Sequence, residues 1–337
     1  MDKKIAVATI EAVYTLAFQR SPGERELEHW AGALQDGRPV SRVLEQIAGS
    51  DEFLARHRLT TFARNGHFHS PVVDPAAVKE YYDREIKTDS YSLRGIDIDE
   101  VAIREELQQL AAVLVTTDIA DTKSPDRRFH FQNGYFPFGD AAVLRAILGV
   151  HRPRRVVEIG SGYSTVCILD AIDEFGLETA LTCIEPFPQR LKSLLWPGDP
   201  SKIRVVEAMA QEINLSEFER LEDGDILFVD STHVLKTGSD VHFVLFHILP
   251  RLRKGVFIHF HDCPYPFEYP RNWVFEQNMS WNEAYAIRAM LLYNSNFSIT
   301  FWLTFLIKKY VDEVRKVLPK LCDTPYGSGL WIRRVAD

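Results

Sequence analysis

The chain has 337 residues, of which 46% are hydrophobic, 26% charged and 12% aromatic, a composition typical of folded globular proteins and unlike that of disordered or fibrous ones. Its length predicts two domains, or one large domain with an appendage. Lysine and arginine number 39 against 47 aspartate and glutamate, for a formal net charge of −8. Because a negative chain repels a phosphate backbone, we expect no nucleic-acid partner.

The cysteines and the apolar runs bear on the compartment. The four cysteines are far apart, and three of them fall within apolar patterns typical of buried strands and helices, which predicts reduced core thiols. The longest apolar run, 299–307, includes two threonines and is too short to span a bilayer. Glu11 interrupts the apolar N-terminal stretch and no small-residue cleavage site follows it, so we expect no signal peptide. These features predict a cytoplasmic protein without a membrane span.

Residues 1–62 are predicted to form a small all-helical domain, because apolar residues recur at three- and four-residue spacings between turn sequences. Ser41 and Ser50 are expected to be helix N-caps. The pattern resembles a helical domain of unknown function that occurs in bacterial surface- and glycan-associated proteins; its elements are Tyr14, Arg20-Ser21-Pro22, Trp30, Gly37 and Gly49–Phe53. The resemblance implies no chemistry, and we expect these helices to contact a protein partner or to self-associate.

Residues 63–125 are interpreted as a linker followed by helices that cover the next domain. The stretch around His67 and His69 has no sustained period and no neighbouring carboxylate or cysteine, which favours a linker over a metal site. Residues 76–115 are expected to be two helices, broken near 92–95.

Residues 126–337 are predicted to be an α/β domain with a Rossmann-like, seven-stranded, mostly parallel sheet, because short apolar strands alternate with amphipathic helices. The expected strands are 155–159, 180–184, 203–207, 226–230, 256–260, 297–306 and 330–335, and the expected helices are 165–175, 188–195, 240–252, 281–293 and 309–318.

A glycine loop follows the first strand and opens a helix, the point at which an α/β sheet presents backbone N–H groups to a ligand. The loop and the start of the helix comprise Gly160, Ser161, Gly162, Tyr163, Ser164 and Thr165. Thr165 replaces the third glycine of a dinucleotide fold, and there is no phosphate-binding lysine. Glu158, two residues before the loop, predicts positive charge on the ligand.

The next strand ends supply groups for a nucleoside. Glu185 is placed to accept hydrogen bonds from both ribose hydroxyls. Ala208 belongs to a small, apolar stretch that suits the flank of an adenine ring, and Asp230 ends the fourth strand. Acids at successive strand ends without a phosphate-binding lysine fit S-adenosylmethionine better than NAD or ATP.

The combined motifs at 130–335 resemble the class I S-adenosylmethionine-dependent methyltransferases and are similar to the macrocin-type sugar O-methyltransferase group. The motifs are Glu158-x-Gly160-x-Gly162, Glu185, Asp230-x-x-His233 and His261-Asp262. The resemblance implies that residues 131–140 fold over the cofactor, that the acids at the strand ends bind a divalent metal, and that the acceptor is a sugar.

Methyl transfer requires alignment of donor and acceptor and a group that takes the proton of the acceptor. His261, at the end of its strand, is the preferred general base and His233 the alternative, whereas His259 is expected to be a core residue. Asp230 and Asp262 can instead share Mg²⁺ and lower the pKa of a substrate hydroxyl. No third oxygen ligand is evident, and the choice between base and metal stays open.

A proline-rich loop at 263–273 carries Tyr265, Phe267, Tyr269 and Trp273 and is expected to form an aromatic wall suited to a sugar or a phenol. A connector packed on the domain is the alternative. We therefore expect an O-directed methyltransferase that acts on a small-molecule or glycan acceptor, in polysaccharide biosynthesis. A non-catalytic cofactor-binding scaffold of a glycan-assembly complex and an NAD-dependent oxidoreductase are the alternatives.

Overall fold

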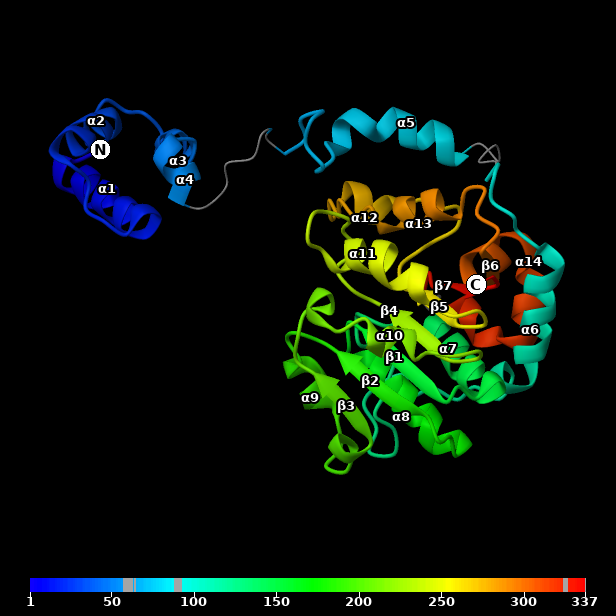
Figure 1. The fold of residues 1–337 in the computed structure, drawn as a ribbon. Helices are drawn as coiled ribbons and strands as arrows, with labels where there is room; N and C mark the ends of the chain where they lie inside the picture. Colours follow the sequence, from blue (N-terminus) through cyan, green and yellow to red (C-terminus); the bar gives the residue numbers. More distant parts are fainter. Residues whose placement is uncertain (57–62, 64, 88–92, 324–326, 337) are drawn as a thin grey trace. The chain divides into compact units, whose positions relative to one another are not determined.

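The computed structural model describes residues 1–56, 63, 65–87, 93–323 and 327–336. The chain divides into two compact units, Met1–Asp74 and Pro75–Asp337, whose elements are labelled in Figure 1. No helix in these described segments is long and apolar enough to cross a bilayer. Cys167, Cys183 and Cys263 are buried free thiols, as the apolar patterns around them predict.

The first unit contains α1 (Lys3–Phe18), α2 (Glu24–Gln35), α3 (Val40–Ala48) and α4 (Asp51–Arg56). Their apolar faces meet in one core, made of Ala6, Ile10, Tyr14, Phe18, Ala31, Leu34, Val43 and Ile47. The guanidinium of Arg20 joins α2 to α4, since it lies 2.7 Å from both Glu26 and Glu52. Ser50 caps α4 through the Phe53 amide, as predicted.

The prediction that Ser41 caps a helix is wrong. Helix α3 already begins at Val40, and Pro39 occupies the N-cap position with φ −58°. Proline presets the backbone for a helix start, so the helix begins before the serine.

The second unit is built on a seven-stranded sheet of order β3-β2-β1-β4-β5-β7-β6. The strands are β1 (Arg155–Ile159), β2 (Ala180–Ile184), β3 (Ile203–Val206), β4 (Ile226–Val229), β5 (Phe257–Phe260), β6 (Phe297–Trp302) and β7 (Leu330–Arg334). All pairs are parallel except those of β7, which runs antiparallel to β5 and β6. The predicted Rossmann-like sheet is confirmed.

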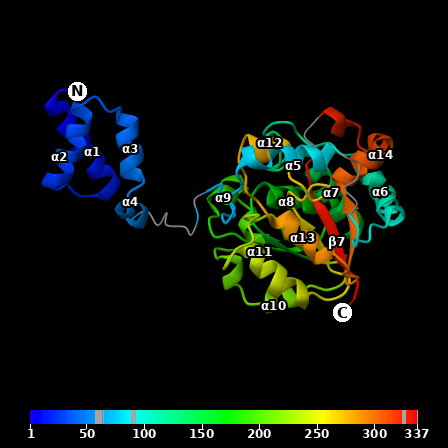
Figure 2. The same ribbon diagram turned by 90° about the horizontal axis from the view of Figure 1, so that it is seen from above.

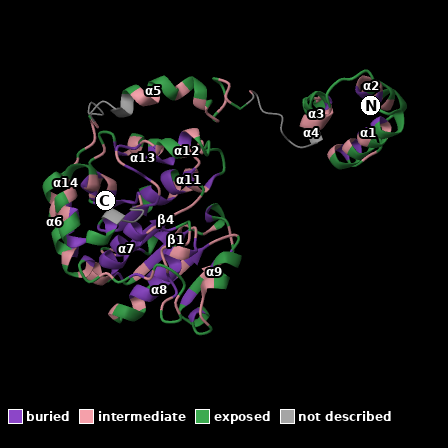
Figure 3. Ribbon diagram, turned by 180° about the vertical axis from the view of Figure 1, so that it is seen from behind, coloured by how far each residue is buried: buried purple, intermediate pink, exposed green. Residues whose placement is uncertain are grey.

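Helices cover the sheet and join its strands. Three of them, α6 (Glu100–Leu114), α7 (Phe138–His151) and α8 (Tyr163–Phe175), pack in sequence against one another, and the sheet with α7 and α8 holds much of the buried core (Figure 3). Helix α5 (Pro75–Lys87) lies beside α12 (Arg271–Phe275) in both Figure 1 and Figure 2. The remaining helices are α9 (Gln189–Leu194), α10 (Ser216–Glu219), α11 (Asp240–Phe243), α13 (Glu283–Leu291) and α14 (Leu303–Val317).

The structure differs from the predicted elements at several places, among them the short helices α10 and α12, which were not predicted. The strand expected at 297–306 ends at Trp302, where α14 begins, because a short apolar run fits a strand or a buried helix equally well. The helix expected at 240–252 is α-helical only to Phe243 and continues as a π-turn and a 3₁₀ turn that contains Pro250. Helix α7 was not predicted.

Candidate functional site

A cavity of about 2060 Å³ opens at the carboxyl ends of β1, β2, β4 and β5, the edge at which open α/β sheets bind ligands. It exceeds the range of roughly 300 to 1,000 Å³ that is usual for one small ligand, which leaves room for two ligands side by side. The predicted site residues that line it are Gly160, Ser161, Gly162, Tyr163, Ser164, Glu185, Asp230, His233, His261 and Asp262.

The glycine loop forms one wall of this cavity. Gly160 has φ +83°, and a Cβ there would lie 1.7 Å from the carbonyl oxygen of Asp230, so only glycine lets the end of β1 approach the end of β4 so closely. The Glu185 carboxylate accepts the backbone N–H groups of Ser161 at 3.1 Å and Phe187 at 2.8 Å. These bonds hold Glu185 against the loop while its side chain lines the cavity.

Glu158, which the sequence predicts to lie near the ligand, is not among the residues that line the cavity. It is fully buried, and its carboxylate accepts hydrogen bonds from the hydroxyls of Ser164, at 2.6 Å, and of Thr165, at 2.5 Å. Burial raises the pKa of Glu158 to about 7, although these two hydrogen bonds oppose the rise. Glu158 therefore braces the first turn of α8 from beneath the loop.

Two other predicted cofactor residues lie outside the cavity lining. The Thr165 hydroxyl is directed inward, where it also accepts the Gly162 N–H. At the end of β3 the lining residues are Met209 and Ala210, and Ala208 is not among them. The chain turns directly after β3, where the Ala208 N–H donates to the Val206 carbonyl, so the position that faces the cavity falls one residue later than the strand pattern predicts.

A cluster of acids and histidines lies at the centre of the site. His233, after β4, has φ 58°, and its carbonyl oxygen accepts the backbone N–H groups of Asn282 and Glu283 at the start of α13. Its Nδ1 lies 2.8 Å from Glu283 Oε2. Its Nε2 faces Asp230 Oδ1 at 3.6 Å and Asp262 Oδ2 at 3.8 Å. Glu283 thus orients the ring and leaves Nε2 toward the cavity.

His261, at the end of β5, is buried between two further carboxylates. Its Nδ1 lies 3.7 Å from Asp140 Oδ2 and its Nε2 lies 3.7 Å from Asp262 Oδ1. Neither ring nitrogen has a hydrogen-bond partner among the described residues. Asp140, in the first turn of α7, is held by the backbone N–H groups of Ser328 and Gly329. The ring of His261 therefore lies between Asp140 and Asp262 without a hydrogen bond to either carboxylate.

The carboxylates determine the charge of these histidines. Burial lowers the pKa of His233 and of His261, but the surrounding carboxylates outweigh it, so both pKa values are raised. Burial acts on Asp230 in the opposite direction and is outweighed by His261 and His233, so the pKa of Asp230 is lowered. His259 is buried against Phe228, its ring centroid 4.1 Å away, and burial lowers its pKa strongly, as expected for a core histidine.

The proposed Mg²⁺ pair does not fit this geometry. Nε2 of His233 lies between the carboxylates of Asp230 and Asp262. Within the described segments, no group of three or more His, Cys, Asp and Glu side chains is arranged to hold a metal ion. No metal-dependent step follows from this arrangement.

The cavity lining suits an organic ligand better than a metal ion. The hydroxyl oxygens of Ser161 and Ser231 are buried in the cavity lining and have no hydrogen-bond partner in the described chain. Buried polar groups are normally paired, so unpaired hydroxyls in a cavity indicate a ligand with polar atoms.

The other half of the cavity is largely aromatic. Tyr265, Tyr269 and Trp273 line it as predicted, joined by Trp281 and by Tyr82 of α5. Phe267 is buried in the core instead, and Arg271 turns away to pair with Asp83. Tyr82 donates a hydrogen bond of 2.9 Å to the Tyr269 carbonyl, and burial raises its pKa to about 12.

Sequence reasoning gave no individual role to several residues of the site, among them Tyr82, Asp140, Arg190 and Glu283. Each of these four comes from an element outside the strand ends on which the prediction relied, and none belongs to a motif. An acid at the start of a predicted helix is the one signal that applies to Asp140 and Glu283, and it occurs at many helix starts without any site.

The strand order, with β7 alone antiparallel and the cavity at the carboxyl edge, is that of the class I methyltransferases. A family model described as a methyltransferase domain matches residues 157–263. An uncharacterised protein of Archaeoglobus fulgidus is 31% identical over 176 residues, which cover 48% of this chain and 74% of the relative. The chain therefore belongs to this methyltransferase family, and the prediction of a methyltransferase is confirmed.

Two solved structures illustrate the likeness of fold. A SAH-bound methyltransferase of Podospora anserina is 14% identical, with a TM-score of 0.39, and the match covers 81% of this chain and 99% of that one. An O-methyltransferase of Streptomyces achromogenes involved in tomaymycin synthesis, in complex with SAM, is 18% identical, with a TM-score of 0.36, covering 77% and 96%. At these values we transfer no residue roles.

Proposed function

We propose that the protein transfers the methyl group of S-adenosylmethionine to a hydroxyl of a sugar or glycan intermediate. The observation that carries the proposal is one cavity with three consecutive parts: the glycine loop with Glu185, the acid–histidine cluster, and the aromatic half. A methyl donor in the first part and an acceptor in the third would meet at the histidines.

The first part suits the nucleoside and amino-acid portions of the donor. Residues 160–164 line this part, where Ser161 supplies a hydroxyl without a hydrogen-bond partner in the described chain, and Glu185 supplies acceptors for a ribose diol. Asp230 and Asp262 favour a cationic ligand, because both carboxylates line the cavity. When bound, the cofactor supplies an electrophilic methyl group.

The cluster suits the removal of a proton from the acceptor. We prefer His233 as the base that takes this proton, because Glu283 fixes its Nδ1, while its Nε2 lies 3.6 Å from the Asp230 carboxylate, beyond hydrogen-bond distance. His261 is the second candidate. Next to a positively charged methyl donor, a histidine loses its own proton more readily, which frees a ring nitrogen.

The aromatic half suits a sugar, whose C–H faces stack on rings while its hydroxyls seek polar partners. Tyr265, Tyr269 and Trp273 offer the rings, and Glu268 and Asn272 line the same region. These residues support a role in polysaccharide biosynthesis. Tyr82 adds a ring from outside the domain that the family model matches.

Two measurements test the proposal. Calorimetric titration with S-adenosylmethionine, S-adenosylhomocysteine and NADH should show binding of the first two compounds and none of NADH; the opposite result would refute it. Incubation with tritiated methyl donor and a panel of methyl glycosides, sugar nucleotides and catechols should then yield a labelled sugar. Cofactor binding without any labelled product would indicate a cofactor-binding scaffold, and labelling of catechols alone would move the acceptor class to phenols.

A further inference from the structure

Residues 128–137 run across the cofactor half of the cavity and lead directly into α7. We call this segment the strap. Phe131, Gln132 and residues 134–137 line the cavity, so the strap is in contact with whatever occupies it. Different kinds of interaction hold its first end, its turn and its tip.

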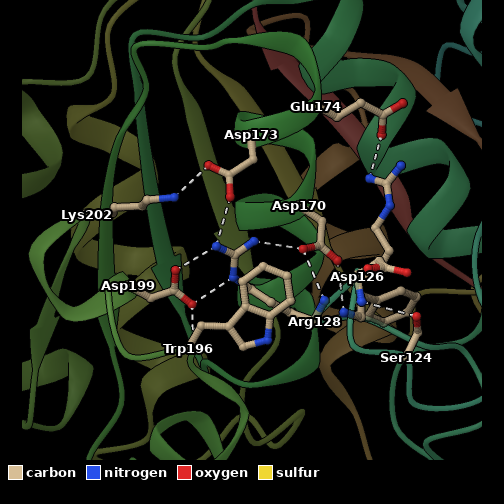
Figure 4. Close-up of polar contacts among 11 residues, drawn as sticks. Ser124, Asp126, Arg128, Asp170, Asp173, Glu174, Trp196, Asp199 and Lys202 are labelled. Atoms are coloured by element: carbon tan, nitrogen blue, oxygen red, sulfur yellow. Dashed lines mark hydrogen bonds and ion pairs between the residues drawn. The ribbon is translucent and has the colours of Figure 1, made fainter.

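The first end is anchored by a buried ion cluster (Figure 4). Only 2% of the Arg128 side chain is exposed. Its guanidinium reaches Asp199 at 2.6 Å, Asp173 at 2.8 Å and Asp170 at 2.9 Å, and it lies 4.1 Å from the Trp196 ring centroid. Asp170 also accepts the backbone N–H groups of residues 128 and 129. The start of the strap is therefore bound to α8 and to the β2–β3 connection.

The middle of the strap is a preformed turn. The side-chain amide of Asn133 donates to the carbonyl oxygens of His130, at 2.6 Å, and Phe136, at 3.0 Å. Its oxygen accepts the backbone N–H groups of Tyr135, at 2.7 Å, and Phe136, at 2.8 Å. One side chain thus closes the turn on both sides, and Gly134 takes the left-handed conformation with φ +77°.

The Tyr135 side chain, at the tip of the strap, is held by ring contacts. The Tyr135 ring lies between two side chains of the cofactor half: the guanidinium carbon of Arg190 is 3.8 Å from its centroid, and the Tyr163 ring is stacked at 5.8 Å and 13°. Tyr163 follows the glycine loop, and Arg190 is in α9. Tyr135 is 59% exposed, so its contacts can open without disturbing the core.

The strap also contacts the acid–histidine cluster. The neighbouring Phe136 is buried, and its ring centroid lies 5.0 Å from that of His261. The position of the strap is therefore coupled to both the cofactor half and His261.

The family resemblance already implies that this segment folds over the cofactor. We propose that Tyr135, held between Arg190 and Tyr163, is a positioning residue that sets how long the cofactor stays bound. The rigid anchor and turn leave the ring contacts at the tip as the part that opens. This inference rests on S-adenosylmethionine being the cofactor.

The test is a dissociation measurement that needs no acceptor. The full chain is loaded with tritiated S-adenosylmethionine and diluted into excess unlabelled S-adenosylhomocysteine, and the label retained on a filter is followed over time. Because one stacked pair and one cation–π contact are lost, Tyr135→Ala should dissociate about tenfold faster than the wild type. Tyr135→Phe keeps both contacts and should stay within about twofold.

Tyr81→Ala is the matched control. Tyr81 is 55% exposed, has the Arg84 guanidinium 5.3 Å from its ring centroid, and lies outside the cavity lining. Its rate should equal that of the wild type. A Tyr135→Ala rate within twofold of the Tyr81→Ala rate overturns the strap inference alone, because the wild type would still have bound the label. A wild type that retains no label overturns the proposed cofactor as well.

Discussion

Replacement of Arg128 by methionine should destabilise the second unit, and the structure indicates by how much. Asp199 is as buried as Arg128 and would lose its only ion-pair partner among the described residues, keeping one backbone N–H, that of Trp196. Asp170 would keep its two backbone N–H donors, and Asp173 would keep Lys202 at 2.7 Å. Breaking one buried pair costs about 3–5 kcal/mol, and we expect Arg128→Met to lose that amount at pH 8.

The loss should depend on pH with a defined sign. In the wild type, burial raises the pKa of Asp199, but the hydrogen bonds from Arg128 outweigh it, so the pKa is lowered. The stabilisation is therefore fully present above the unfolded pKa of about 3.9 and is lost as the pH falls through the folded value. In the variant, burial is opposed only by the Trp196 N–H and the charge of Lys202, so Asp199 takes up a proton more easily. The difference between the two proteins should be largest near pH 8 and shrink toward pH 5.

Urea unfolding followed by near-ultraviolet circular dichroism at both pH values measures this difference. The control is Arg127→Met, because the adjacent Arg127 is 39% exposed and pairs with Glu174 at the surface, a contact worth less than about 1 kcal/mol. The double variant Arg128→Met/Asp199→Asn should recover part of the loss, since no buried charge remains at residue 199. A loss below 1 kcal/mol at pH 8, or one that grows on acidification, would refute the reasoning.

Three further changes test the site. Gly160→Ala should abolish cofactor binding in calorimetry, because its Cβ would overlap the Asp230 carbonyl, whereas Gly176→Ala, also at positive φ but with open space around it, should bind normally; equal affinities would contradict this. Glu185→Gln should weaken cofactor binding about tenfold through the loss of charge-assisted hydrogen bonds, and an unchanged dissociation constant would remove Glu185 from the ribose site. Glu283→Gln should lower kcat at least about tenfold at unchanged cofactor affinity, because His233 loses its orienting carboxylate; full activity would shift the proton acceptor to His261.

A separate prediction is that methyl transfer does not need a metal ion. Because the imidazole of His233 lies between Asp230 and Asp262, transfer to the acceptor found in the screen should persist after treatment with a chelator. Loss of activity that Mg²⁺ restores would show that the two carboxylates rearrange around a metal.

Much of the sheet was predictable because its signals are local. Each of β1 to β5 is a short, largely apolar run that is followed by a polar or glycine residue, and such runs alternate with helical patterns. The sequence around β6 was ambiguous, since the apolar residues on both sides of Trp302 suit a strand or a buried helix, and packing decided that α14 begins at Leu303. Helix α7 was hidden because it is almost wholly buried and has no polar face to show a period.

The sequence by itself determined the class of fold, the glycine loop and the strand-end residues Glu185, Asp230, His233 and His261, since parallel strands bring their carboxyl ends to one edge. Only the tertiary structure decided that the carboxylate of Glu185, and not that of Glu158, faces the cavity. Glu158 lies three residues before Ser161, yet it points beneath the loop to the first turn of α8. Likewise, Glu283 reaches His233 and Arg128 reaches Asp199 across long stretches of chain. The direction of a buried charged side chain depends on partners distant in sequence that satisfy it, and no local pattern records those partners.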